Sequence, residues 1–272
     1  MSEERVLVDI ADHVATVTMN RPEKHNALDA GMFEGLLGAT LRLREEPGVR
    51  AVVLHGKGPS FCSGIDIGSL MSGPVSMEDL MAREEGQVGN LFQRVCTDWT
   101  QVPVPVIAAI QGNCFGGGLQ IALGADLRIA APDAKLRVLE IKWGLVPDMG
   151  ITQTLPRLLG IDKAKELTFT GREVRGEEAD RLGLVTSLAD DPLAAAHALA
   201  ADIASRSPQA IRAAKQLYDA AWAGGMPAAD ALILETELQV GLMGSPNQIA
   251  AVTAGMTKQP AEFTDPGVPA EV

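Results

Sequence analysis

Three consecutive glycines, Gly116, Gly117 and Gly118, are the residues whose type and spacing point most directly to chemistry. They follow the apolar run 104–110 and directly precede a segment with helical character. Backbone N–H groups at the start of a helix have no partner within it, the helix dipole adds partial positive charge, and glycine has no Cβ to cover them. Such a turn can bind either a phosphate group or the negative charge that develops on a carbonyl oxygen.

The surrounding sequence argues against a phosphate site. No lysine follows the glycines as in a nucleotide-binding loop, and no G-x-G-x-x-G sequence opens a strand–helix–strand unit. A second bend, at Ser63-Gly64 after the strand-like run 51–54, can point the N–H group of Ile65 into a cleft. Taken alone, each bend is more often a plain turn or a packing requirement. Together, the N–H groups of Ile65 and Gly117 can bind one carbonyl oxygen.

Four short motifs resemble the enoyl-CoA hydratase/isomerase (crotonase) family, in the order and with the spacings of that family. The similarity extends over nearly the whole chain, from residue 6 to residue 263. It implies that the N–H groups of Ile65 and Gly117 bind the thioester oxygen of an acyl-CoA. The motifs are Asn20-Arg21-Pro22 with Asn26-Ala27-Leu28, residues 61–67, residues 110–112 with 116–119, and residues 145–150.

The resemblance also implies which residues surround the substrate. The loop around residues 24–27, with Ser63 and Asp66, is expected to line the channel for coenzyme A. No cofactor is expected, because coenzyme A is part of the substrate, and no metal is expected. The candidate substrate-binding residues are Lys24, His25, Ala27, Ser63, Asp66, Gly116 and Pro147.

A thioester carbonyl acidifies the proton on the neighbouring carbon, so the site also needs a carboxylate that can move this proton. Hydratases of the family carry two glutamates, the first of them two residues after the last glycine. Here this position is Gln120, which can donate or accept a hydrogen bond but cannot take a proton at neutral pH. The second position is Glu140. A glutamate without this context is usually a solvated surface residue, but the motif makes Glu140 the candidate base.

Asp148 follows Glu140 in the segment Pro147-Asp148-Met149-Gly150 and allows two interpretations. It could cap the helix that follows, since aspartate is a favoured N-cap residue. Alternatively, it could be a second acid or base, because the dienoyl-CoA isomerase branch of the family carries an aspartate at the matching position. That branch has a further aspartate at the position of Gln120, so the match is partial.

Three functions therefore remain open. The first is an isomerase of enoyl- or dienoyl-CoA with Glu140 as the base. In the family, simple 3,2-enoyl-CoA isomerases need only the glutamate at this position. The second is a 2-enoyl-CoA hydratase in which Asp148 replaces the missing carboxylate and Gln120 orients the water. The third is a catalytically silent acyl-CoA-binding relative. Met71, Met81, Trp99 and Trp143 are candidates for the acyl pocket, although core packing explains each of them more simply.

The composition excludes several other classes of protein. The 272 residues include 35 acidic and 23 Lys or Arg residues, giving a formal net charge of −12, which argues against binding to nucleic acid or to an anionic membrane surface. The longest apolar run is interrupted by prolines, and the first residues do not resemble a signal peptide. Three cysteines without metal-like spacing indicate reduced thiols and a cytoplasmic location. The four histidines show no metal-ligand spacing.

Hydrophobic periodicity predicts alternating strands and helices up to about residue 185, and then four helices, which indicates an α/β core followed by a helical region. The tail after Pro260 is expected to be frayed. Strands are expected at 6–10, 14–19, 51–54, 104–110 and 127–130, and an extended segment at 136–143. Helices are expected at 28–44, 77–100, 119–124, 152–159, 193–205, 208–223, 228–243 and 248–256, and a loop at 56–73.

The resemblance refines this expectation for the fold and the assembly. It implies a crotonase-like spiral of β-β-α units in residues 1–207, and a C-terminal helical oligomerisation region in residues 208–272. Members of the family form trimers that commonly pair into hexamers. A homotrimer or hexamer is therefore expected, with the C-terminal helices packed against neighbouring subunits.

Overall fold

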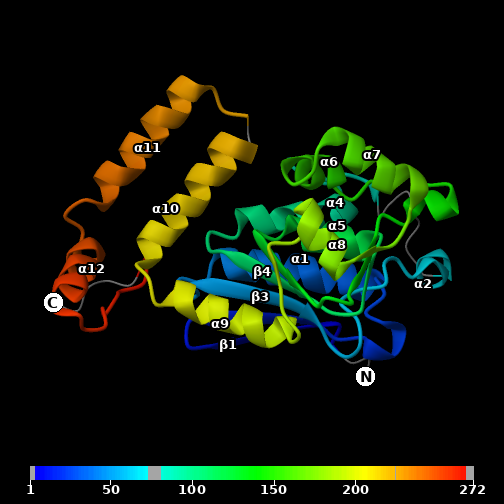
Figure 1. Ribbon diagram of the computed structural model, residues 1–272, viewed down its shortest axis with the longest axis horizontal. Helices are drawn as coiled ribbons and strands as arrows, with labels where there is room; N and C mark the ends of the chain where they lie inside the picture. The colour runs from blue at the N-terminus through cyan, green and yellow to red at the C-terminus, as the bar shows by residue number, and fades with distance from the viewer. Residues whose placement is uncertain (1–3, 73–80, 224, 268–272) are drawn as a thin grey trace.

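A six-stranded sheet forms the centre of the computed structural model, which describes residues 4–72, 81–223 and 225–267 (Figure 1). Its strand order is β1-β2-β3-β4-β6-β9. β1 is antiparallel to β2, and the other neighbouring strands are parallel. The strands are β1 (Val6–Ala11), β2 (Val14–Met19), β3 (Ala51–Gly56), β4 (Val106–Ile110), β6 (Leu127–Ala130) and β9 (Ser187–Leu188).

Both faces of this sheet are covered, as the continuous apolar sequence of its central strands requires. Alternate residues of β3 point to opposite faces, so Val52 and Leu54 belong to one apolar cluster and Ala51 and Val53 to another. The first cluster lies under helices α1, α4 and α5. The second lies under α9, whose alanines at every fourth position let the helix approach the strands closely (Figure 1).

A small second sheet has the strand order β5-β7-β8. Its strands are β5 (Asn113–Phe115), β7 (Lys135–Arg137) and β8 (Val174–Arg175). An isolated parallel bridge joins Cys62 to Cys114 in β5, with Cys62 N donating to Asn113 O at 3.0 Å. The segment after β3 is therefore held beside the segment that leads into the glycine turn.

Side-chain caps mark the start of several helices. Asp29 accepts a hydrogen bond from Met32 N at the start of α1, and Asn90 and Gln93 form a capping box at the start of α4. The α-helices are α1 (Ala30–Arg44), α2 (Ile67–Ser72), α4 (Leu91–Thr97), α5 (Gly117–Gly124), α6 (Ile151–Thr154), α7 (Ile161–Thr170), α8 (Gly176–Leu182), α9 (Pro192–Ala204), α10 (Pro208–Tyr218), α11 (Ala228–Leu242) and α12 (Pro246–Thr257). Short 3₁₀ helices are η1 (Pro22–Lys24), η2 (Asp98–Gln101), η3 (Glu140–Trp143) and η4 (Leu155–Arg157), and η5 (Asp219–Ala223) is a π-helix.

The structure corrects three of the predicted elements. The segment 56–73, expected to be a loop, contains helix α2 from Ile67, and the Asp66 carboxylate accepts a hydrogen bond from Ser69 N at 3.1 Å at the start of this helix. The helix expected at 77–100 is not continuous, because residues 82–90 are irregular and α4 starts only after the Asn90 cap; residues 73–80 lie outside the described part. The extended segment expected at 136–143 is extended only to Arg137. It then turns into η3, which ends at Gly144 in the left-handed conformation. The remaining predicted strands and helices are confirmed to within a few residues.

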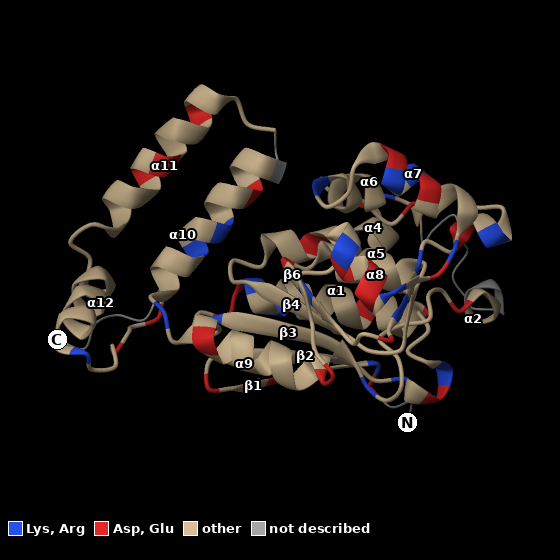
Figure 2. Cartoon of the chain, in the orientation of Figure 1, with Lys and Arg blue, Asp and Glu red and all other residues tan. Residues whose placement is uncertain are grey.

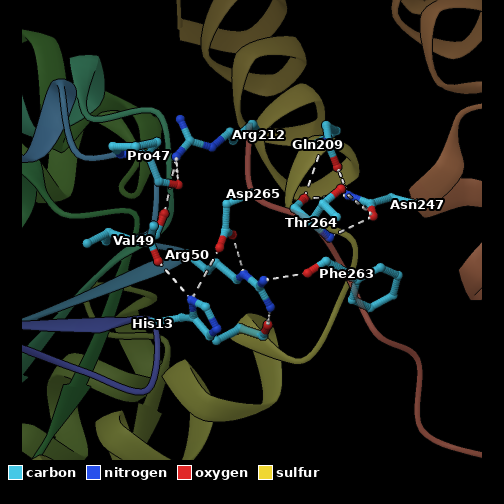
Figure 3. A network of polar contacts seen from close by, with 12 residues as sticks. His13, Pro47, Val49, Arg50, Gln209, Arg212, Asn247, Phe263, Thr264 and Asp265 are labelled. Atoms are coloured by element: carbon cyan, nitrogen blue, oxygen red, sulfur yellow. Dashed lines mark hydrogen bonds and ion pairs between the residues drawn. The ribbon is translucent and has the colours of Figure 1, made fainter. Parts of the chain in front are cut away.

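The C-terminal helices α10, α11 and α12 extend away from the sheet (Figure 1). The segment after α12 was expected to be frayed, and for residues 261–265 this prediction is wrong. Arg50, directly before β3, binds the Asp265 carboxylate at 2.6 Å and the Phe263 carbonyl at 3.0 Å, and Asn247 of α12 binds the Thr264 carbonyl at 2.8 Å (Figure 3). These partners lie far apart in the sequence, so no local pattern predicted them.

In the described residues, every helix is too short or too polar to span a lipid bilayer.

Candidate active site

The bend after β3 leaves one backbone donor without a partner. Gly64 adopts a φ of +93°, a conformation that favours glycine. Its carbonyl accepts a hydrogen bond from Leu28 N, and the following Asp66 N donates to Leu28 O. Between these two bonds, Ile65 N has no acceptor among the described residues. The local fold therefore exposes the N–H group that the sequence singled out.

The glycine turn provides the second donor. Gly116 has a φ of +51°, and its N–H is used by Arg137 O at 2.9 Å. Gly117 is the first residue of α5, and within the described part of the chain its N–H has no hydrogen-bond acceptor. A Cβ at Gly118 would lie 2.6 Å from Cβ of Cys62, so close packing also requires glycine there. The turn thus presents one free N–H at a helix start.

These two donors lie side by side at one cavity of about 340 Å³. A Cβ at Gly64 would lie 2.9 Å from Phe115 O and 3.8 Å from Gly117 N, which shows how closely the two bends approach. The wall of the cavity is mainly apolar. The described residues that line it are Ser63, Gly64, Ile65, Ile67, Gly116, Gly117, Leu139, Glu140, Trp143 and Leu145.

Glu140 lines the same cavity, at the start of η3. Its Oε1 accepts a hydrogen bond from Nε2 of Gln120 at 2.7 Å, while its Oε2 is buried without a partner among the described residues. Burial raises the pKa of the Glu140 carboxyl, and the charge of Asp148 raises it slightly further, against hydrogen bonds that lower it. A carboxylate with a raised pKa is a stronger proton acceptor than an ordinary one.

Gln120 is not part of the described cavity wall. Its side chain is buried, with the residue only 1% exposed, and its Oε1 accepts a hydrogen bond from Met149 N at 2.9 Å. The amide therefore bonds at one end to Glu140 and at the other to the backbone after Asp148. The structure brings together Gln120 and Glu140, the two positions at which hydratases of the family carry glutamates.

Asp148 is exposed, and within the described residues it takes part in no hydrogen bond or ion pair. The interpretation of Asp148 as a helix cap is wrong, because α6 starts after Gly150 and has no side-chain cap. Gly150 adopts a φ of +89°, which turns the chain into the helix without help from Asp148. Asp148 is still near enough to Glu140 for its charge to raise the pKa of that carboxyl.

A family model described as enoyl-CoA hydratase/isomerase matches residues 9–265. The chain belongs to this family.

Relatives with different printed functions are similar to the chain. The mitochondrial Delta(3,5)-Delta(2,4)-dienoyl-CoA isomerase of Rattus norvegicus is 38% identical over 211 residues, which is 75% of this chain and 64% of that protein. A probable enoyl-CoA hydratase of Rhodobacter capsulatus is 35% identical over 266 residues, 97% of this chain and 99% of that protein. The family is an enzyme family that acts on acyl-CoA thioesters, and these names do not select one reaction for this chain.

The crystal structure of enoyl-CoA hydratase from Bacillus anthracis confirms the predicted fold class. It superposes with a TM-score of 0.85 at 30% sequence identity, covering 95% of this chain and 98% of that chain. The crotonase-like α/β architecture with a C-terminal helical region was therefore predicted correctly from the motifs.

The candidate residues for an enoyl-CoA hydratase/isomerase substrate channel fall into two groups. Ser63 and Gly116 line the cavity, whereas Lys24, His25, Ala27, Asp66 and Pro147 are not among its described lining residues. Lys24 and His25 are exposed in and after η1, where Ser63 N donates to His25 O at 2.9 Å. These residues lie beside the bend that leaves Ile65 N without an acceptor among the described residues.

Asp66 has partners within the protein. Arg21 binds its carboxylate at 2.9 Å, and the Ser69 hydroxyl donates to it at 2.7 Å. The Ser69 hydrogen bonds, with Arg21 contributing less, lower the pKa of Asp66. Asp66 therefore holds the loop after the bend together, and a role in binding coenzyme A remains a prediction.

The apolar wall of the cavity was only partly predicted. Trp143 lines it and is 57% exposed, so this residue is no core residue, whereas Trp99 is fully buried in the core. Met81 is exposed, and the side chain of Met71 lies outside the described part. Ile67, Leu139 and Leu145 were missed, although the last two flank the predicted Glu140 segment and could have been found from that position.

Proposed function

We propose that this chain isomerises the carbon–carbon double bond of an enoyl- or dienoyl-CoA, with Glu140 as the base. One observation carries the proposal: Glu140 is the only titratable side chain among the described residues that line the cavity. The residue bonded to it, Gln120, cannot take a proton. A single carboxylate suits a reaction that moves one proton and adds nothing to the substrate.

The reaction of a 3-enoyl thioester illustrates the roles. Glu140 takes a proton from C2, and the electrons of the C–H bond move toward the carbonyl oxygen. The N–H groups of Ile65 and Gly117 stabilise the resulting dienolate oxygen. The carboxylic acid then returns its proton to C4, the double bond moves from C3–C4 to C2–C3, and the carbonyl reforms. The base ends in its starting state.

Burial prepares Glu140 for this task. A base with a raised pKa binds a proton more tightly than an ordinary carboxylate, and desolvation is the main cause of the raised pKa here. The largely apolar wall formed by Ile67, Trp143 and Leu145 also provides a surface for an acyl chain.

The test is conversion of 3-enoyl-CoA and 3,5-dienoyl-CoA by the wild type, Glu140→Ala and the isosteric Glu140→Gln. The wild type should convert one of these substrates, and both variants should lose roughly a hundredfold or more in kcat because the base is absent. Thermal unfolding would show whether the variants fold. Unchanged turnover in folded variants would contradict the proposal.

Hydration of a 2-enoyl-CoA is the second candidate, supported by the names of similar hydratases. It requires a further group to hold and activate water, a role expected of Asp148 and Gln120 on sequence grounds. The loss of enoyl-thioester absorbance would measure it. Binding of acyl-CoA without turnover of any enoyl, dienoyl or hydroxyacyl substrate would instead favour a silent relative.

We also propose a homotrimer or hexamer, as the family resemblance implies. α11 has no buried residue although it carries large apolar side chains, and Leu232, Ile233 and Val240 are each more than half exposed. α12 has no charged residue, and α11 has only acidic ones (Figure 2). Light scattering after size exclusion should give three or six times the mass of one chain, and a monomer at micromolar concentration would contradict this.

A further inference from the structure

Gln120 occupies the position where a family hydratase has a carboxylate, and its surroundings define what it can do instead. Its amide nitrogen donates to Glu140 Oε1 at 2.7 Å, and its amide oxygen accepts from Met149 N at 2.9 Å. Both ends of the amide are thus used by the protein. These two bonds also fix which end is the oxygen, because Met149 N can only donate.

Burial separates this amide from the substrate. Gln120 is 1% exposed, and it is not among the described residues that line the cavity. A group that orients a water for attack must reach that water within hydrogen-bond distance. In this arrangement Gln120 reaches Glu140 and the backbone, so the water-orienting role expected for it has no support in the geometry.

We infer that Gln120 is a positioning residue: it holds the Glu140 carboxylate in one orientation and ties it to the segment that supports the Gly117 donor. The inference rests on the proposed function, because it concerns how the base of that reaction is held. Its two hydrogen bonds, its burial and the contact described next carry it.

The tie between the base and the donor runs through Met149. The N–H of Met149 binds Gln120, and its sulfur lies against Gly117, where a Cβ would be only 2.8 Å away. Glu140, Gln120, Met149 and Gly117 therefore form a continuous chain of contacts from the carboxylate to the N–H group at the start of α5. If the base is held at a fixed position relative to the oxyanion donor, it is already oriented toward the substrate carbons, which favours proton transfer.

The same hydrogen bond also tunes the base. Burial raises the pKa of Glu140, and the bond from Gln120 is one of the interactions that lower it. The second oxygen, Oε2, has no described partner. Without Gln120, neither oxygen of the carboxylate would have a side-chain donor among the described residues. The carboxylate would then rotate more freely and bind its proton more tightly.

The experiment compares Gln120→Met, which keeps the length of the side chain and removes both hydrogen bonds, with Gln153→Met on the exposed face of α6. With the thioester that the wild type isomerises, kcat of Gln120→Met should fall by roughly tenfold to a hundredfold, since a small misplacement of a catalytic group has effects of this size. KM should change little, and the acid limb of the pH profile should move to higher pH. Gln153→Met should match the wild type.

Two results would overturn the inference. One is a Gln120→Met enzyme with unchanged kcat and pH profile. The other is a Gln120→Met enzyme in which only KM rises, which would place Gln120 in contact with the substrate. Should Gln120→Met fail to fold, Gln120→Glu keeps the shape of the side chain and replaces the amide donor by a carboxylate. In this variant the acid limb should also move to higher pH.

A measurement without substrate separates this inference from the proposed function. ¹³C NMR titration of the Glu140 carboxyl in the free protein should show a higher pKa in Gln120→Met or Gln120→Glu than in the wild type. An unchanged pKa in the folded variants overturns the positioning role, whatever the activity. If the pKa rises but the wild type isomerises none of the thioesters, the proposed reaction fails and the positioning of Glu140 stands.

Discussion

The side chain of Met149 occupies the space that a side chain at Gly117 would need. A Cβ at position 117 would lie 2.8 Å from Sδ of Met149 and 3.0 Å from Cδ1 of Leu28. Both neighbours are buried, Met149 at 1% exposure and Leu28 at 0%. The position of the Gly117 N–H therefore depends on the absence of a side chain at residue 117, because Met149 and Leu28 fill that space, as well as on its place at the helix start.

Gly117→Ala should reduce activity far more than it reduces stability. The added methyl group must push Met149 or Leu28 aside or tilt the start of α5, so the N–H would no longer point at the thioester oxygen. Losing one oxyanion donor costs roughly a hundredfold or more in kcat, whereas overpacking costs about 1–3 kcal/mol of stability. Steady-state kinetics and urea unfolding would measure the two effects.

Gly38→Ala in α1 is the matched control. No atom lies within 4 Å of a Cβ at this position, so alanine should fit without strain and leave the kinetics unchanged. Full activity in Gly117→Ala would show that the thioester oxygen does not use this N–H.

Glu140→Gln should make the protein more stable at neutral pH. Burial raises the pKa of this carboxyl above its ordinary 4.5, so the folded protein binds the proton more tightly than the unfolded chain does. Its contribution to stability is fully present below the ordinary pKa and is lost as the pH rises through the raised one. A neutral glutamine avoids that loss. The stability difference between variant and wild type should thus shrink as the pH falls through the raised pKa.

Urea unfolding at a series of pH values would test this expectation. Glu166→Gln provides a control of opposite sign, because the hydrogen bond from Arg172 lowers the pKa of Glu166 in the folded protein. The glutamate at 166 favours folding above its ordinary pKa, and this contribution is lost as the pH falls through the lowered one. A Glu140→Gln variant that is less stable than the wild type at pH 7.5 would contradict the picture of a buried, desolvated base.

Much of the site could be predicted because its parts follow local rules. The strand-like runs 51–54 and 104–110 placed two bends at strand exits, and the glycines at 64 and 116–118 indicated free N–H groups. The partners of Gln120 could not be predicted in this way. Its contacts with Glu140 and Met149 depend on three segments that meet only in the folded chain, and the residue type alone was compatible with orienting a water.

The helix expected at 77–100 failed for a different reason. Apolar residues with helical spacing continue through the first half of this segment, but Gly86 and Gly89 interrupt the helical pattern. Asn90 then forms the capping box that starts α4. The periodicity outweighed these local stop and start signals in the prediction. The same signals were available in the sequence and would have placed the helix start correctly.

Asp148→Asn should move the acid limb of kcat/KM to lower pH. The negative charge of Asp148 contributes to the raised pKa of Glu140, and its removal should lower that pKa. If Asp148 is also the second acid or base for dienoyl substrates, turnover of 3,5-dienoyl-CoA should fall by roughly a hundredfold or more. Turnover of 3-enoyl-CoA should then be retained.

The effect of Asp148→Asn is measured with both substrates and against a control variant that removes an exposed charge elsewhere. Asp162→Asn, at an exposed position in α7, removes the same charge without touching the site and should leave both profiles in place. Equal loss on the two substrates in Asp148→Asn would argue against a role specific to dienoyl substrates. An unmoved acid limb would show that the charge of Asp148 is screened from Glu140.

Asp265→Ala should release the C-terminal tail from the core. Arg50, 8% exposed, binds Asp265 at 2.6 Å and also holds the carbonyls of Ala204 and Phe263, so one guanidinium joins β3, the end of α9 and the tail (Figure 3). Hydrogen bonds to charged groups typically contribute about 1.5–3 kcal/mol, and a loss of this size in the free energy of unfolding is expected. Asp202→Ala, which removes an exposed ion pair with Arg206, should cost much less.

Hydrogen exchange would locate the effect of Asp265→Ala. Because Asn247 binds the Thr264 carbonyl, release of the tail should increase exchange in α12 and at the start of α10, while the strands around the active site remain protected. Increased exchange spread evenly over the central sheet would mean that Asp265 stabilises the whole fold. Unchanged exchange in α12 would show that Asn247 holds the tail without Arg50.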